Sequence, residues 1–167
     1  DDINTFKLNY ESGMRDPIDD HKAFKSDTYQ LGEEIGSGGF GTVYKGWHIH
    51  LRKHVAIKTQ ISLLNKMSAK EARLLAQVKS PNVVHIENFN KLKDGRIYLV
   101  MEWIEGQTLQ HRIRRGRGEN ERIARQWMRQ CCQGMVVLQE KDIIHRDLKP
   151  ANLFLDDNVI KIGDFGL

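Results

Sequence analysis

The spacing of hydrophobic and polar residues predicts strands in the first part of the chain and helices in the second. Residues 1–25 are polar, contain one proline and have no clear period, so residues 1–28 are expected to be an extension or linker ahead of the folded unit. From Tyr29 the pattern predicts two strands that meet at a glycine-rich turn. HVAIKTQI, at 54–61, predicts a third strand, so an antiparallel sheet is expected to begin here.

The next segment changes to helical spacing. In SAKEARLLAQV, at 68–78, small and apolar residues recur at steps of three and four, and the same step reaches Lys79. Ser80-Pro81-Asn82 is expected to end this helix. VVHIENFN, at 83–90, and RIYLVMEW, at 96–103, then predict a strand pair that completes a small, mostly β lobe.

After Gly106 the pattern becomes mainly helical. Asn120 is a candidate N-cap for a helix that runs to about Gln139. Its apolar stripe consists of Ile123, Trp127, Cys131, Met135 and Leu138. Short strands are predicted at 143–145, 152–156 and 159–163, on either side of two polar loops. The whole pattern predicts an α+β chain with two lobes.

Composition and charge exclude several classes of protein. No apolar run approaches the roughly 18 residues needed to span a bilayer, and the first residues lack the pattern of a signal peptide, so a cytoplasmic or nuclear location is expected. Cys131 and Cys132 are adjacent and are expected to be reduced packing residues. The net charge is +4, and the basic stretch at 112–122 is interrupted by glycine and glutamate. We expect a solvated surface segment there and no nucleic-acid partner.

Three histidines, His48, His50 and His54, lie close together in HIHLRKH. Because no cysteine or carboxylate cluster accompanies them, they are expected to be solvated histidines and not metal ligands.

The glycines of GSGGFG, at 36–41, have the spacing G-x-G-x-x-G. Such a loop brings backbone N–H groups close to a polyphosphate, because glycine has no Cβ. Dinucleotide-binding folds use the same spacing, but there the glycines open a helix, whereas here a strand follows. An ordinary glycine-rich hairpin is the alternative.

The strand VAIK, at 55–58, places Ala56 and Lys58 on one face, because side chains alternate along a strand. A small Ala56 leaves room for a flat base, and Lys58 brings a positive charge to where phosphates would lie. The alternative is a lysine that points into water. Glu71 is a candidate ion-pair partner of Lys58, or the glutamate of a capping box that begins at Ser68.

HRDLKPAN, at 145–152, and DFG, at 164–166, carry the candidate catalytic residues. Phosphoryl transfer needs a positioned hydroxyl, metal ions and charge stabilisation more than covalent chemistry. Asp147 can accept the hydroxyl proton, and Lys149 can neutralise the transferred phosphate. Asn152 and Asp164 offer the oxygen ligands that Mg²⁺ prefers. Any one of these residues alone is commonly a turn residue.

Taken together and in this order, the motifs resemble the signature set of eukaryotic protein kinases, from about Tyr29 to Leu167. The resemblance implies a bilobal protein-kinase-like fold. Residues 29–104 would form the N-terminal lobe and hinge, and residues 105–167 part of a C-terminal lobe that is expected to stop just after DFG. It implies ATP and Mg²⁺ as cofactors.

The resemblance also implies roles for individual residues. The catalytic residues would be Lys58, Glu71, Asp147 and Lys149, with Asn152 and Asp164 as metal ligands. Trp103 would lie in the hinge, whose backbone pairs with adenine, and His145 and Phe165 would stack with Leu75 in a regulatory spine. The nucleotide would contact Ile35, Gly36, Ser37, Gly38, Gly39, Phe40, Gly41, Val43, Ala56, Lys58, Met101, Glu102, Ile104 and Phe154.

Lys149-Pro150 follows the serine/threonine pattern of this family, so the resemblance implies transfer of the ATP γ-phosphate to a Ser or Thr hydroxyl of a protein substrate. Thr108 and Ala151 stand where kinases that select arginine often have carboxylates, so strong selectivity for basic sites is not expected. Two alternatives remain: a truncated kinase-like module that binds a nucleotide or a partner without turnover, and a related phosphotransferase that acts on small molecules.

Overall fold

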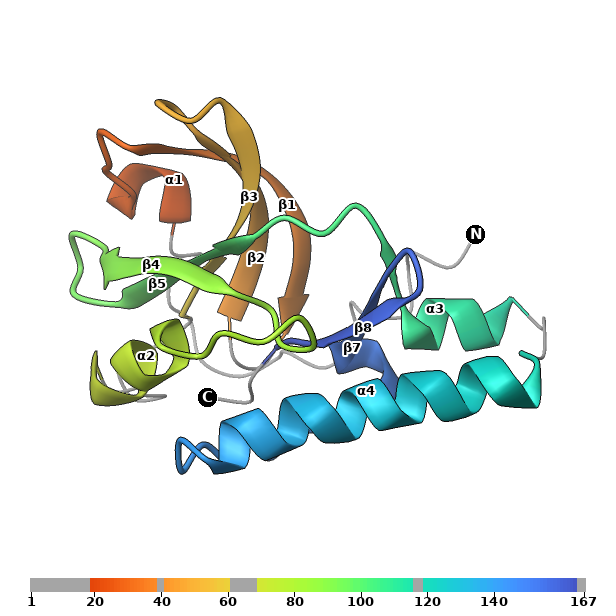
Figure 1. The fold of residues 1–167 in the computed structure, drawn as a ribbon. Helices are drawn as coiled ribbons and strands as arrows, with labels where there is room; N and C mark the ends of the chain where they lie inside the picture. The colour runs from red at the N-terminus through yellow and green to blue at the C-terminus, as the bar shows by residue number, and fades with distance from the viewer. Residues whose placement is uncertain (1–18, 39–40, 61–68, 116–118, 165–167) are drawn as a thin grey trace, which may run out of the picture.

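Two structural parts follow each other along the chain in the computed structural model, which describes residues 19–38, 41–60, 69–115 and 119–164 (Figure 1). The first, here called the sheet lobe, contains α1, β1 to β5 and α2. The second, the helical lobe, contains α3, α4 and β6 to β8. This arrangement confirms the predicted α+β class with a small antiparallel sheet in the first lobe.

A five-stranded antiparallel sheet forms the sheet lobe, in the strand order β1-β2-β3-β5-β4. Burial alternates along β2 from Tyr44 onward, whereas residues 97–100 of β5 are all buried, and Val55 and Ile57 of β3 are fully buried. The elements are α1 (Asp20–Ala23), β1 (Tyr29–Gly38), β2 (Gly41–His48), β3 (Lys53–Thr59), α2 (Ala69–Ala76), β4 (Ile86–Lys91) and β5 (Ile97–Glu102).

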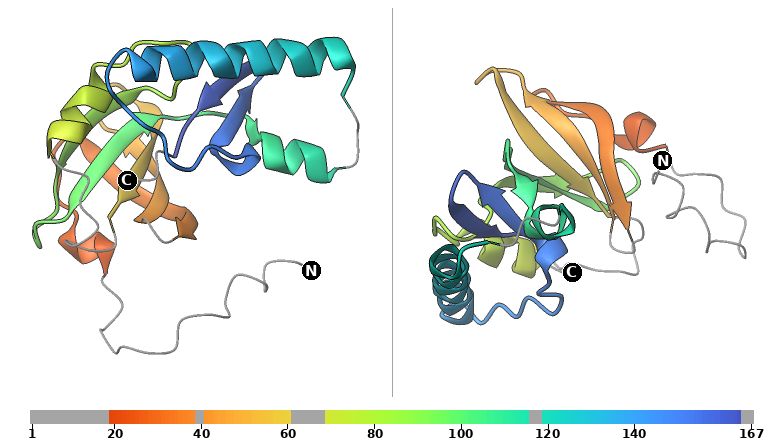
Figure 2. Two further views of the ribbon diagram at one scale, coloured as in Figure 1. Left: turned by 90° about the horizontal axis from the view of Figure 1, so that it is seen from below. Right: turned by 90° about the vertical axis from the view of Figure 1, so that its right-hand side faces the viewer.

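The helical lobe packs one long helix against a small three-stranded sheet, ordered β6-β7-β8 (Figure 2). Asn120 caps α4, since its side chain accepts a hydrogen bond from Arg122 N at 2.8 Å. Trp127, Cys131 and Leu138 of the predicted stripe are buried. The elements are β6 (Gln107–Thr108), α3 (Leu109–Arg114), α4 (Glu121–Gln139), a 3₁₀ turn (Pro150–Asn152), β7 (Leu153–Asp156) and β8 (Val159–Ile162).

The residues ahead of β1 are part of the folded sheet lobe. Asp20 and Phe24 are buried, and Phe24 lies in the core beside Tyr98, with their ring centroids 4.8 Å apart. The interpretation as a linker is therefore wrong for residues 19–28. The segment is mostly polar, so its sequence does not indicate that Phe24 packs in the core or that the Asp20 carboxylate is buried.

Two predicted elements differ in the structure. Residues 143–145 form no strand, because the N–H of Ile143 is bonded to the Leu138 carbonyl at 3.0 Å, where the chain leaves α4. Helix α2 ends at Ala76, so Lys79 is exposed and Val78 is the buried residue after the helix.

His48 is buried, so the prediction that all three histidines of HIHLRKH are solvated is wrong for it. Its ring packs on Tyr29 at 4.9 Å between centroids, and its Nδ1 accepts a hydrogen bond from Leu51 N at 3.3 Å. His50 and His54 are exposed. Among the residues that the structure describes, no group of three or more histidine, cysteine or acidic side chains is placed to hold a metal ion.

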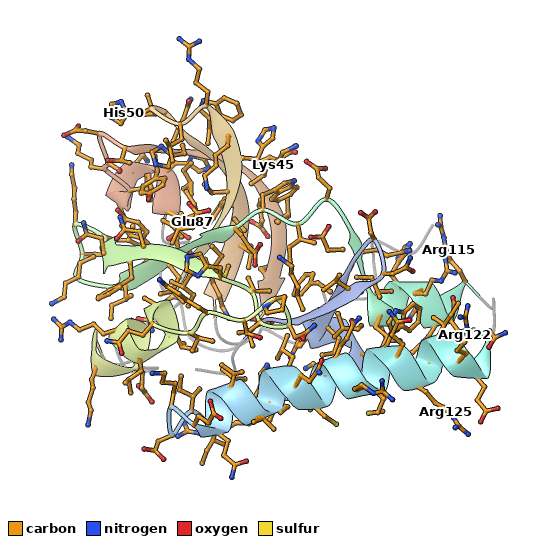
Figure 3. All side chains as sticks on the ribbon, viewed as in Figure 1. Lys45, His50, Glu87, Arg115, Arg122 and Arg125 are labelled. Atoms are coloured by element: carbon orange, nitrogen blue, oxygen red, sulfur yellow. The ribbon has the colours of Figure 1, made fainter. Side chains whose placement is uncertain are left out.

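The basic stretch lies where α3 leads to α4, and Figure 3 shows Arg115, Arg122 and Arg125 at that end of the molecule, away from the sheet lobe. Arg115 and Arg122 of this stretch are exposed, as is Arg125 just after it, whereas Arg112 and Glu119 are half-buried and form an ion pair. The predicted solvated surface segment is therefore confirmed for the exposed residues of the stretch and not for these two. Arg125 pairs with Glu121 one turn earlier. No helix in the described ranges is long and apolar enough to cross a bilayer.

Candidate active site

The glycine-rich loop joins two antiparallel strands. Gly38 pairs with Gly41, Ser37 with Thr42 and Gly36 with Val43, which confirms the strand context predicted for the loop. A Cβ on Gly41 would lie 2.1 Å from the Thr59 carbonyl oxygen, so a larger residue does not fit against β3. Gly39 and Phe40 lie outside the described residues.

A cavity of about 200 Å³ lies under this hairpin, between the two lobes. Backbone groups of the loop, an ammonium group and a carboxylate meet there, a combination that suits a polyphosphate with a bound cation. Its lining, among the described residues, is Gly36, Ser37, Gly38, Gly41, Val43, Lys58 and Asp164.

Lys58 is directed into this cavity by β3. Its register partner on β2 is Val43, and its side chain is 11% exposed, so the alternative of a lysine in water is wrong. Its ammonium forms an ion pair with Asp164, which comes from the other lobe, 106 residues later. The predicted contact between Lys58 and Glu71 stays a prediction, and Ser68 of the alternative capping box lies outside the described residues.

The loop at 145–152 is tied to the chain just before Asp164. The buried His145 places Nε2 3.0 Å from the Gly163 carbonyl oxygen, and Gly163 N donates to the Asn152 carbonyl at 2.9 Å. Asp164 has a φ of 52°, in the left-handed region that non-glycine residues rarely adopt. Such strained backbone is typical of functional sites, and here these bonds hold it.

Asp147 receives two polar side chains. Asn152 Nδ2 donates to its carbonyl at 2.7 Å and to its Oδ2 at 3.1 Å, and Lys149 Nζ lies 2.7 Å from the same Oδ2. The hydrogen bond from Lys149, helped by a smaller one from Asn152, holds the pKa of Asp147 below its ordinary value. The carboxylate is therefore ionised at neutral pH and can accept a proton.

The donor set fits a magnesium ion. Asn152 uses its amide nitrogen on Asp147, so neither bond occupies its oxygen, and Asp164 keeps its side chain 45% exposed. One carboxylate and one amide oxygen are hard ligands of the kind that Mg²⁺ takes together with phosphate oxygens.

The end of the site expected to hold adenine is formed by β3, β5 and the segment after β5. Ala56 pairs with Met101 in the sheet register, and β5 ends at Glu102, with Trp103 and Ile104 leading to the helical lobe. The aromatic ring of Phe154 lies against Gly163, where an added Cβ would be 2.8 Å from it.

Six of the residues expected to contact the nucleotide are not among the described residues that line the cavity, so their roles stay predictions. They are Ile35, Ala56, Met101, Glu102, Ile104 and Phe154.

The structure adds a contact at the hinge that motif matching missed. The Glu102 carboxylate accepts a hydrogen bond from His85 N at 2.8 Å and lies 2.6 Å from Lys161 Nζ of β8. The alternation of Lys161 with the buried Ile160 and Ile162 indicated a side chain on the opposite face of β8. Nothing in the sequence indicated its partner 59 residues earlier.

Comparisons with known proteins agree with this geometry. A family model described as "Protein kinase domain" matches residues 29–167. The chain is 38% identical over 148 residues to serine/threonine-protein kinase ATG1a of Arabidopsis thaliana, covering 83% of this chain and 23% of that protein. It is 32% identical over 158 residues to CBL-interacting protein kinase 26 of Oryza sativa subsp. japonica, covering 90% of this chain and 31% of that protein.

A third relative is serine/threonine-protein kinase atg1 of Dictyostelium discoideum, 36% identical over 152 residues, with 83% of this chain and 23% of that protein covered. The chain thus spans less than a third of the length of these relatives. The family model, the ordered motifs and the cavity between the lobes agree, and the chain belongs to the protein kinase domain family.

Proposed function

We propose that this chain is the nucleotide-binding and catalytic part of a serine/threonine protein kinase. It binds Mg·ATP between its lobes and directs the γ-phosphate to a Ser or Thr hydroxyl of a protein substrate. The observation that carries this proposal is the single cavity that brings together the glycine-rich hairpin, Lys58 and Asp164.

The positions of the charged groups indicate how the site would bind the ATP phosphates. The hairpin offers backbone N–H groups, and Lys58 offers a cation held in place by its ion pair with Asp164. Asn152 and Asp164 would hold Mg²⁺, which when bound neutralises charge on the transferred phosphate. With ATP present, Lys58 exchanges part of its contact with Asp164 for phosphate oxygens.

The acceptor end of the site is formed by Asp147 and Lys149. Asp147 is ionised at neutral pH and accepts the hydroxyl proton, while Asn152 orients its carboxylate by donating a hydrogen bond to Oδ2. Lys149 Nζ lies 2.7 Å from Asp147 Oδ2, so a hydroxyl held by Asp147 would react beside a cation that stabilises charge on the phosphate.

The choice of a Ser or Thr acceptor rests on two supports. Lys149-Pro150 follows the serine/threonine pattern of the family. The relative from Arabidopsis thaliana, at 38% identity, is named a serine/threonine-protein kinase.

Calorimetric titration of ATP into the chain, with magnesium and then with a chelator, tests the binding half of this proposal. We expect binding that depends on magnesium and that Asp164→Asn weakens by about tenfold or more. Asp157→Asn is the matched control, because Asp157 has nearly the same backbone conformation, with φ 53° against 52°, but lies in the exposed turn before β8. A folded chain whose ATP affinity is unchanged by magnesium and by Asp164→Asn contradicts the proposal.

A further inference from the structure

A buried polar cluster lies on the face of the sheet opposite the cavity. It consists of Asp20 from α1, Tyr44 from β2, Thr59 from β3 and Arg96 from the turn before β5, and we call it the Asp20 cluster. Asp20 Oδ2 accepts hydrogen bonds from Tyr44 Oη at 2.9 Å and from Thr59 Oγ1 at 2.5 Å. Asp20 Oδ1 lies 2.7 Å from Arg96 Nη2, an ion pair whose angles fall outside hydrogen-bond alignment.

Because the cluster is buried, the loss of any of these contacts would be energetically costly. The side chains of Asp20 and Arg96 are each 5% exposed, and an unpaired charge at such a position is strongly unfavourable. Arg96 is fixed further by Asp94 at 2.8 Å and by the Gln60 carbonyl at 2.7 Å. Burial, followed by the hydrogen bond to Asp20, raises the pKa of Tyr44, so this phenol stays protonated and keeps donating.

The cluster lies directly behind the phosphate end of the site. Tyr44 and Thr59 immediately follow Val43 and Lys58, which line the cavity from the other face of the same two strands. The Thr59 backbone also supports the loop, because its carbonyl oxygen packs where a Cβ on Gly41 would lie. One carboxylate therefore holds the end of β3 and the returning arm of the glycine-rich hairpin.

We propose that Asp20 is a positioning residue of the kinase site. It lies nine residues ahead of the segment that matches the family model, yet it fixes the hairpin and Lys58 in the geometry that receives the ATP phosphates. The inference rests on the function proposed above. The cluster contacts β3 at Thr59, whereas Ala56 and Met101, which are expected at the adenine, pair three residues earlier on that strand. Asp20 therefore governs affinity for the phosphates and not for the base.

Affinities of the chain for Mg·ATP and for adenosine, measured by calorimetry, test the inference. For Asp20→Asn we expect Mg·ATP binding weaker by about tenfold, because the backbone N–H contacts of the hairpin lose alignment in addition to Lys58, and adenosine binding changed by less than about twofold. Asp19→Asn is the matched control: the adjacent Asp19 is exposed, caps α1 and should leave both affinities unchanged. If Asp20 served only the stability of the fold, the substitution would change the affinities of the folded protein for Mg·ATP and for adenosine equally, or would change neither.

Circular dichroism shows whether each variant is folded. If Asp20→Asn does not fold, two substitutions at Thr59 replace it as the test. Thr59→Val removes the hydroxyl that donates to Asp20 and should lower the ratio of ATP affinity to adenosine affinity. Thr59→Ser retains the hydroxyl and should preserve that ratio. An unchanged ratio in folded Asp20→Asn, or in Thr59→Val, overturns the inference alone. A wild-type chain that binds adenosine but gains nothing from the phosphates overturns the proposed function as well.

Discussion

Asp147, the proposed catalytic base, shows how neighbouring side chains fix the charge of a carboxyl group. Lys149 lowers its pKa through a hydrogen bond, and Asn152 holds its orientation. Both neighbours come from the same eight-residue loop. Local sequence was therefore enough to predict that these residues act together.

Removing the cation should raise the pKa of Asp147. In Lys149→Met the carboxyl loses its strongest stabilising partner, so its pKa should move up toward the ordinary value near 3.8. Carbon-13 NMR titration of the carboxyl groups, in the pH range where the chain stays folded, measures this shift. Lys22→Met is the control, since Lys22 instead lowers the pKa of Asp19. An Asp147 titration that is identical with and without Lys149 contradicts the assigned contact.

Lys58→Met should affect turnover much more than affinity. The ammonium aligns phosphates, whereas the adenine contacts are expected from backbone groups of the hinge. In the full-length protein we expect kcat to fall by about 100-fold or more and the Kd for ATP to rise by less than about fivefold. Lys53→Met, at the exposed start of the same strand, should change neither. Equal losses in kcat and affinity would show that Lys58 supports nucleotide binding in general.

At the scale of elements, short apolar and β-branched runs bounded by turn residues predicted the five strands, including β5, in which residues 97–100 are all buried. Strand β6 has two residues, too few to show a period, and the sequence does not indicate it. The apolar residues at 143–145 predict a strand, but the N–H of Ile143 is bonded to the Leu138 carbonyl where α4 ends. Helix α1 has only four residues, too few to show a period. Its place depends on Asp20 and Phe24, whose partners are far away in the sequence.

The contact between α4 and β8 depends on Gly134. An added Cβ there would lie 2.6 Å from the Asn82 carbonyl oxygen and 2.8 Å from Ile162 Cδ1. Despite the better helix propensity of alanine, Gly134→Ala should destabilise the chain by about 1–3 kcal/mol, because backbone must move. Thermal unfolding measures the change, with Gln133→Ala on the exposed face as control. A Gly134→Ala variant as stable as the wild type would show that the helix shifts freely on β8.

At the scale of the whole molecule, the lobes are joined by backbone and by charge. Val84 N donates to the Ile162 carbonyl at 2.8 Å, Ile162 N donates to the Asn82 carbonyl at 2.9 Å, and Glu102 pairs with Lys161. The order of the motifs indicated which residues along the chain are the candidate catalytic residues. It carried no information on these links, since each joins positions more than fifty residues apart.

A double-mutant cycle with Glu102→Gln and Lys161→Met should show that the charged link couples the lobes. The two side chains are 25% and 15% exposed, so we expect a coupling of about 1 kcal/mol in the free energy of unfolding. The Lys53–Glu87 pair has the same 2.6 Å separation within the sheet lobe, and its more exposed lysine should give about 0.5 kcal/mol or less. A coupling at Glu102–Lys161 no larger than at the control pair would show that this ion pair adds nothing to the backbone contacts and the Lys58–Asp164 pair that also join the lobes.

Transfer of labelled phosphate from ATP to a mixed pool of serine, threonine and tyrosine peptides by the full-length protein is the most direct test of the account. The wild-type protein should label serine or threonine. Asp147→Asn should lower the rate by about 100-fold or more while the Mg·ATP affinity stays within about twofold, because Asp147 acts on the hydroxyl, and Asn152 and Asp164 hold the metal. Labelling at the full rate by Asp147→Asn, or no labelling by a wild-type protein that binds Mg·ATP, would contradict it.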